Sequence, residues 1–125
     1  MADRVITIIQ GDRVAKTLKY DVGEELNAAA GDQVTWKIKA GSGVAAITAI
    51  TDGPNSHDLF KGPGGVEPHP INPQKTEWQG TLSTSDQLQE VEEYSITWCS
   101  VGGAWNGANV CGIVTDPKIR ISLGQ

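Results

Sequence analysis

The sequence predicts an all-β protein that folds as a single Greek-key β-sandwich of about seven antiparallel strands. Three observations favour this fold class. Short segments alternate apolar and polar residues with the period of two expected for half-buried strands. Fifteen glycines and six prolines punctuate these segments, and helical periodicity is almost absent. The 125 residues fit one domain, residues 1–125, which at this size buries roughly two thirds of the surface that the unfolded chain exposes.

Seven segments are predicted to be strands. Residues 5–9 are apolar on both faces, which is typical of a strand that is covered on both sides. Residues 44–51 are small and β-branched, which also suits a strand. The other five segments have one apolar and one polar face, as antiparallel strands with one face in water do: residues 18–22, 34–38, 78–82, 94–98 and 119–123.

The rest of the chain is predicted to be turns and connections. The one helical signal covers residues 84–93, where Thr84 and Gln87 have the spacing of a capping box. Because this stretch is short and acidic, we expect at most one short helical turn. Residues 52–75 hold five of the six prolines and are predicted to form the one long connection.

Charge and hydropathy exclude several classes of partner. Ten basic and fifteen acidic residues give a net charge of −5, which argues against binding to nucleic acid or to anionic membranes. The apolar run at residues 5–9 is too short for a membrane span or for the core of a signal peptide. The chain as written is therefore predicted to be cytoplasmic, with secretion after removal of a signal peptide as the open alternative.

Cys99 and Cys111 permit one internal disulfide. Glycines and an Asn-Gly pair lie between them, and Gly112 follows the second cysteine, so the two thiols can face each other across a hairpin. The alternative is two free thiols in a reducing compartment.

Two segments carry a resemblance to a known family. Residues 30–36 (AGDQVTW) resemble the entry to a central strand of cupredoxins, and residues 94–99 (YSITWC), with the glycine-rich loop and last strand that follow, resemble their C-terminal end. The resemblance implies a cupredoxin-like sandwich, and an immunoglobulin-like sandwich is the alternative. A blue-copper site needs two His, one Cys and usually Met. His57 and Cys99 lie where the first His and the Cys would fall, but no His follows Cys99 and the only Met is Met1. We therefore expect no copper and no other cofactor.

The chain also resembles small bacterial proteins that have no assigned activity. They share a Gly-Asp-x-Val-x-Trp-Lys-Ile-Lys segment, which is found here at residues 31–39. Three further shared segments match at residues 77–81, 92–98 and 116–119. This resemblance implies no function.

Catalytic and metal sites have little support in the sequence. His57, Asp58, Glu67 and His69 include ligand types that suit zinc, but their spacing matches no recognised site, so a solvated loop is predicted. Nucleophilic catalysis by a cysteine requires a nearby base, and both histidines lie in the proline-rich connection. We expect the protein not to be an enzyme.

The aromatic residues divide into core and loop positions. Trp36, Trp78 and Trp98 lie on the apolar faces of predicted strands and are expected in the core. Tyr94 is a candidate for the tyrosine that ties a sandwich corner. Trp105 is different, because it lies among small and turn-forming residues, where a large ring often marks a contact surface. The alternative is that this ring folds back over the end of the sandwich.

The predicted function is that of a non-catalytic interaction module or a self-assembling module. Its contact surface would consist of Trp105, Asn106 and Asn109 together with an exposed strand edge. The partner would be another protein or a second copy of the chain. The alternative is a carbohydrate-binding domain in which Trp105 stacks on a sugar and Asn106, Asn109 or Gln79 bind its hydroxyls. An enzyme or metal protein centred on the histidines and cysteines is the third class.

Overall fold

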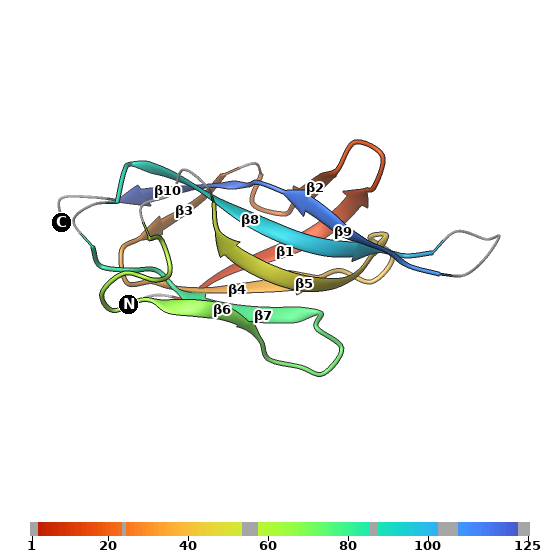
Figure 1. Ribbon diagram of the computed structural model, residues 1–125. Coiled ribbons are helices and arrows are strands. Elements are labelled where there is room, and N and C mark those ends of the chain that lie inside the picture. The colour runs from red at the N-terminus through yellow and green to blue at the C-terminus, as the bar shows by residue number, and fades with distance from the viewer. Residues whose placement is uncertain (1–2, 24, 54–57, 86–87, 103–107, 123–125) are drawn as a thin grey trace.

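The computed structural model describes residues 3–23, 25–53, 58–85, 88–102 and 108–122, and all regular structure in them is β-strand. Ten strands form two five-stranded sheets that pack face to face, so the predicted all-β sandwich is confirmed (Figure 1). No described segment forms a helix that is long and apolar enough to cross a membrane.

The first sheet contains the strands in the order β2, β1, β4, β7, β6. Their bounds are Thr17–Tyr20, Asp3–Asp12, Gln33–Ile38, Glu77–Thr81 and Val66–Pro70. The second sheet has the order β3, β10, β8, β5, and β9 also pairs with β8. Their bounds are Glu25–Ala29, Lys118–Ser122, Val91–Ser100, Val44–Asp52 and Val110–Thr115.

The predicted count of seven strands is wrong, because β3, β6 and β9 were missed. In β3 the inward positions include the small Ala28, which weakens the alternating pattern. Strand β6 contains Pro68 and Pro70, and it accommodates them because, among the described strands, it is an edge strand that pairs with β7 alone. Strand β9 is interrupted by Gly112, which has a φ of 78°.

The expectation of purely antiparallel sheets is also wrong. Strand β1 pairs with β4 in parallel, from Asp3 opposite Gln33 to Ile8 opposite Ile38. Strand β10 pairs with β3 in parallel in the same way. A parallel pair requires a connection that crosses over, and here the chain passes from the first sheet to β3 in the second before it returns to β4 beside β1.

Two local predictions have different outcomes. Residues 5–9 were expected to be covered on both faces, but Ile6 and Ile8 are buried while Val5 and Ile9 on the other face are 40% and 38% exposed. Strand β1 is therefore covered on one face. The prediction of at most one helical turn at residues 84–93 agrees with the described part of this stretch, which contains no helix and whose last three residues begin β8.

The core is centred on an aromatic cluster that joins the two sheets. Trp36 of β4, Tyr94 of β8 and Phe60 of the β5–β6 connection have ring centroids 5.8–6.0 Å apart. The Trp36 indole N–H donates to the Tyr94 hydroxyl at 3.1 Å. Trp78 and Trp98 are buried as predicted. We expected Tyr94 to tie a corner of the sandwich. It is instead a core residue, and its hydroxyl accepts a hydrogen bond from the Trp36 indole of the opposite sheet.

Tyr94→Phe is expected to lower the free energy of unfolding by about 1–3 kcal/mol, because the buried Trp36 N–H loses its acceptor. Tyr20→Phe is the matched control, since the Tyr20 hydroxyl is buried and has no hydrogen-bond partner among the described residues. This control should lose no stability. Urea unfolding followed by tryptophan fluorescence measures both variants, and equal losses would contradict the assigned role of the hydrogen bond.

Candidate functional site

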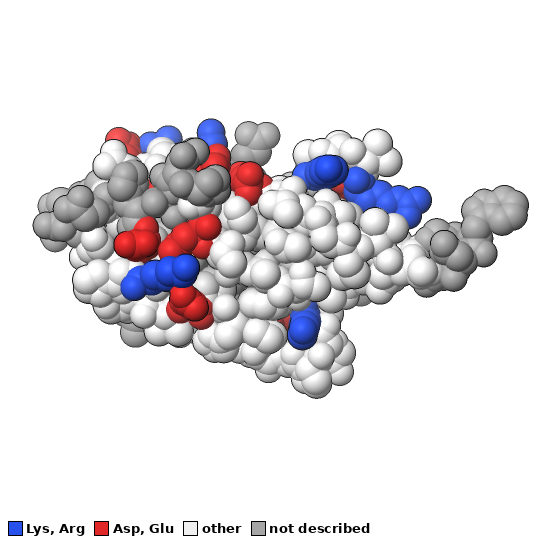
Figure 2. Space-filling model, in the orientation of Figure 1, with Lys and Arg blue, Asp and Glu red and all other residues white. Residues whose placement is uncertain are grey.

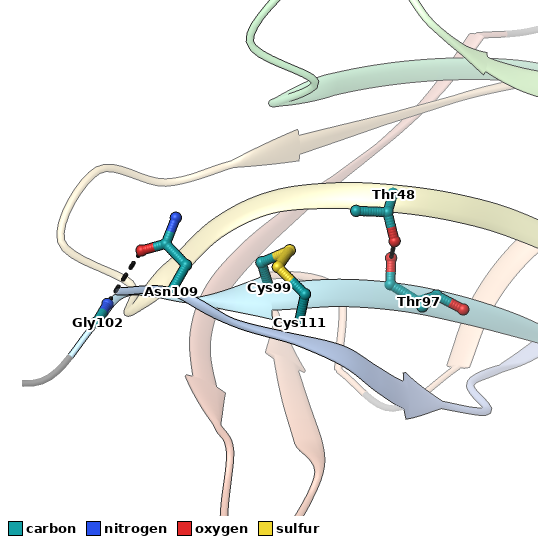
Figure 3. The surroundings of a disulfide bond; sticks show 6 residues. All are labelled: Thr48, Thr97, Cys99, Gly102, Asn109 and Cys111. Carbon is teal, nitrogen blue, oxygen red and sulfur yellow. Dashed lines mark hydrogen bonds between the residues drawn. A yellow bond between two sulfur atoms is a disulfide. The ribbon is translucent and has the colours of Figure 1, made fainter. Parts of the chain in front are cut away.

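The predicted contact residues lie in the chain between β8 and β9, whose described ends extend beyond the other strands of the sandwich (Figure 1). Trp105 and Asn106 lie outside the described residues, so their part in a contact surface stays a prediction. Asn109 is described and exposed. Its Oδ1 accepts a hydrogen bond from the Gly102 amide at 3.1 Å, which ties together the two chain segments at the base of the hairpin (Figure 3).

A disulfide joins Cys99 of β8 to Cys111 of β9, with the Cα atoms 4.0 Å apart (Figure 3). The pairing of the two strands explains how the cysteines meet. Trp98 lies opposite Ile113 and Ser100 opposite Val110, so two residues, Cys111 and Gly112, face the single residue Cys99. This is a β-bulge, and the positive φ of Gly112 permits it.

The disulfide determines what Cys99 can do chemically. A copper ligand or a catalytic nucleophile has to be a thiolate, and the Cys99 sulfur is bonded to Cys111 instead. Cys99 is also buried, whereas Cys111 is exposed. In this state the pair is a structural crosslink at the base of the hairpin.

The outer face of β5, β8 and β9 carries only uncharged side chains over most of its area. Ala49 lies opposite Thr97, and Thr97 lies opposite Val114 on its other side. Figure 2 shows this surface as a continuous area without acidic or basic side chains in the middle of the view. We call it the uncharged face, and it consists of Thr48, Ala49, Thr51, Ser95, Thr97, Cys99, Cys111 and Val114.

The strands that carry the uncharged face are joined by side chains as well as by backbone pairing. The Thr48 hydroxyl donates to the Thr97 carbonyl at 3.2 Å and so joins β5 to β8 (Figure 3). The disulfide joins β8 to β9. On the buried side, the Trp98 indole donates to Thr115 Oγ1 of β9 at 3.0 Å. All three strands are therefore fixed relative to one another.

The histidine cluster predicted from the sequence is only partly brought together. His57 lies outside the described residues. Asp58 is exposed in the β5–β6 connection, while Glu67 and His69 lie on β6. Among the residues that the structure describes, no group of three or more His, Cys, Asp and Glu side chains is arranged to hold a metal ion.

Glu67 and His69 instead line a cleft between β5 and β6, with a volume of about 360 Å³. The most unusual residue of this cleft is Asp52 at the end of β5, which was not predicted from the sequence. Its Oδ1 accepts a hydrogen bond from the Phe60 amide at 3.0 Å. Its Oδ2 is buried and has no hydrogen-bond partner in the described chain. The only signal in the sequence was an acidic residue at the end of a predicted strand.

The surroundings of Asp52 shift the pKa of its carboxyl group upward. Burial raises the pKa of the carboxyl group above its ordinary value, and the charges of Asp58 and Glu67 act in the same direction. The Phe60 amide and the Lys61 ammonium lower the pKa by less than these effects raise it. Perturbed carboxyl groups in clefts are frequent at binding sites.

The residues proposed to bind a carbohydrate are not brought to one place. Gln79 lies on β7 of the first sheet, where it is opposite Thr35 and His69. Asn109 lies at the β8–β9 hairpin of the second sheet. Of the described candidates, only Asn109 is near the loop that contains Trp105.

Comparison with known proteins assigns no family to the chain. No protein-family model matches it, and no curated protein matches it. The resemblances to cupredoxins and to the bacterial proteins that share residues 31–39 therefore stay predictions.

Replacing both cysteines, as Cys99→Ala/Cys111→Ala, is expected to lower the free energy of unfolding by about 3 kcal/mol, because the crosslink closes a loop with a sequence separation of 12 residues. Urea unfolding of the variant and of the wild type, with and without reductant, measures this effect. Ser100→Ala is the control, since the Ser100 hydroxyl is buried without a partner in the described chain. A wild type that is insensitive to reductant would contradict the prediction.

Proposed function

We propose that the protein is a non-catalytic interaction module that binds a protein partner through the uncharged face and the β8–β9 hairpin. A second copy of the chain is the first candidate for the partner. The observation that carries the proposal is the uncharged face itself, because a fifth of all residues are charged and almost none of them lie on it. Charged residues are depleted at the centres of protein interfaces.

The edge of the second sheet at β9 supports this proposal. Within the described residues β9 pairs only with β8, so its other edge offers backbone groups to another chain. Val110 and Val114 are exposed on this strand. Strand β5, by contrast, is partly covered, because the Ile47 amide donates to the Lys75 carbonyl at 3.0 Å. The free edge therefore lies beside the hairpin that was predicted to make the contacts.

Of the two fold resemblances, we favour the cupredoxin-like one. Immunoglobulin-like sandwiches consist of two antiparallel sheets. This sandwich instead contains the parallel pairs β1–β4 and β3–β10. The resemblance concerns the scaffold and assigns no metal to it, since Cys99 is joined to Cys111.

The disulfide also bears on the compartment. Disulfides form and persist in oxidising environments and are rare in the cytosol. The Cys99–Cys111 pair therefore favours secretion, the alternative that the sequence left open, over the cytoplasmic location that it predicted.

Val114→Lys is expected to abolish self-association or raise its Kd by at least about tenfold, because it places a charge within the proposed interface, beside the free edge of β9. Sedimentation velocity over a wide range of concentrations measures the effect, with Trp105→Ala as a second variant. Val5→Lys is the control, since Val5 is 40% exposed on the outer face of the first sheet, whereas the uncharged face belongs to the second sheet.

The association of the wild type and the two lysine variants shows whether a second copy is the partner and whether the uncharged face is the interface. Wild type and Val5→Lys should both associate as the concentration rises, while Val114→Lys should stay monomeric. A wild type that is monomeric at every concentration would exclude a second copy as the partner. Equal association of both lysine variants would exclude the uncharged face as the interface.

Carbohydrate binding through the same hairpin is the second candidate function. Asn109 supports it, because the side chain is exposed and uses its oxygen for the Gly102 amide, which leaves the carboxamide nitrogen turned away from that bond (Figure 3). An N–H group in this position can donate to a sugar hydroxyl.

A glycan array probed with wild type and Trp105→Ala tests this function. We expect the wild type to bind a subset of glycans, and the variant to lose at least about tenfold in affinity because the stacking ring is gone. Gln79→Ala is the control, because Gln79 lies on the other sheet and should not affect binding. An array without signal for the wild type would count against carbohydrate binding.

A further inference from the structure

The cleft between β5 and β6 lies where the edges of the two sheets face each other. Its volume of about 360 Å³ falls in the range of small-molecule sites. We propose that this cleft binds a small organic cation, an ammonium or amidinium group attached to an apolar body, with Asp52 as its counter-ion. This site goes beyond the proposed protein interaction and does not depend on it.

The walls of the cleft suit the apolar body of such a ligand. Ile50, Phe60 and Trp78 provide its apolar lining together with Pro68 and Pro70 of β6. The other described residues that line it are Thr48, Ala49, Thr51, Asp52, Lys61, Glu67 and His69.

These walls are fixed before any ligand binds. The Phe60 ring packs against Trp36 and Tyr94 in the core. The Trp78 indole donates to the Lys75 carbonyl at 3.3 Å. Pro68 packs closely over Gly80, where an added Cβ would lie 3.0 Å from the proline ring. A preformed cleft binds more tightly, because little conformational freedom is lost on binding.

Asp52 supplies the polar contact. Its Oδ1 is satisfied by the Phe60 amide, which holds the carboxylate in one orientation. Its Oδ2 is buried without a hydrogen-bond partner in the described residues, and a buried acceptor in this state is unfavourable. Asp52 lines the cleft, but Oδ2 is shielded from solvent, so a small rotation of the Asp52 side chain has to turn this atom toward the ligand. A ligand that then donates an N–H to Oδ2 would remove the penalty.

The charges around the cleft favour a cation over a neutral donor. Asp52, Glu67 and the neighbouring Asp58 are acidic, and Lys61 is the basic residue that influences Asp52. Lys61 and Asp52 form no salt bridge within the described chain. Figure 2 shows acidic side chains around a basic one over the end of the molecule where β5 leads to β6. A hydroxyl ligand would satisfy Oδ2 but would leave this excess of negative charge uncompensated.

The affinity of the cleft for a cation should depend on pH. The titratable groups that face Asp52 are Asp58 and Lys61 from the connection and Glu67 and His69 from β6, and Tyr94 of β8 lies opposite in the sheet. The cation binds the ionised carboxylate, so affinity falls as the pH drops through the pKa of Asp52. Because burial raises that pKa, the loss occurs at a higher pH than for an ordinary aspartate.

A pair of probes with the same shape but different charge tests the inference. Benzylamine and benzyl alcohol are titrated into ¹⁵N-labelled protein at neutral pH, and the amide of Phe60 and the indole N–H of Trp78 report binding. We expect benzylamine to shift both signals and to bind at least about tenfold more tightly than benzyl alcohol, as a charge-assisted hydrogen bond should.

Two carboxamide variants locate the counter-ion. Asp52→Asn keeps the shape of the side chain and should weaken benzylamine binding by at least about tenfold. Asp58→Asn removes a nearby charge that does not line the cleft, so its affinity should stay within about threefold of the wild type. If Asp52→Asn does not fold, the amide signal of Phe60, which donates to Asp52 Oδ1, reports the ionisation of Asp52 in the wild type as the pH is varied. The affinity for benzylamine should then fall over the same pH range as this signal changes, and a loss over a different range would overturn the counter-ion assignment.

The titrations test the counter-ion and the binding site separately. Equal affinities for benzylamine and benzyl alcohol would overturn the counter-ion assignment. The absence of shifts at Phe60 and Trp78 with either probe at millimolar concentration would overturn the binding site itself. An equal loss in Asp52→Asn and Asp58→Asn would attribute binding to the general negative field instead of to Asp52.

Discussion

The contact between Trp36 and Tyr94 is the interaction on which the rest of the structure depends. It joins the central β4 of one sheet to β8 of the other through both ring packing and a hydrogen bond of 3.1 Å between buried groups. Phe60 completes the cluster from the β5–β6 connection. Because the Phe60 ring is held in the core, its backbone amide is held beside Asp52. The polar centre of the cleft is therefore positioned by the apolar core.

A second constraint acts at the opposite end of β8. The long strand pairs with β10 through its first residues and with β9 through its last ones, while β5 follows it on the other side. The disulfide and the bulge at Gly112 fix β9 against β8 at this end. The aromatic cluster and the disulfide thus stabilise different ends of one strand. The uncharged face runs along β8 from Ser95 to Cys99, so both the aromatic cluster and the disulfide support it.

Alternation of apolar and polar residues predicted five of the ten strands and the burial of Trp36, Trp78 and Trp98. The composition of two further apolar or β-branched segments predicted β1 and β5. Alternation failed where local chemistry hides the pattern, as with Pro68 in β6 and Gly112 in β9. Parallel pairing was not predictable, because the direction of β4 beside β1 is set by the path of the chain through the other sheet. The cleft could not be predicted either, since the Asp52 carboxylate and the Phe60 amide meet only after the connection has folded.

Strand β5 belongs both to the uncharged face and to the cleft between β5 and β6. Thr48 and Thr51 lie on the uncharged face and also at the rim of the cleft, whereas Asp52 and Ile50 lie within the cleft. A partner on the face and a cation in the cleft would therefore contact the same strand from two sides. Thermodynamic linkage requires that any effect of one ligand on the affinity of the other be reciprocal. Since β5 is joined to β8 by the Thr48 hydroxyl and to the β6–β7 turn by the Ile47 amide, it connects the two sites through direct bonds.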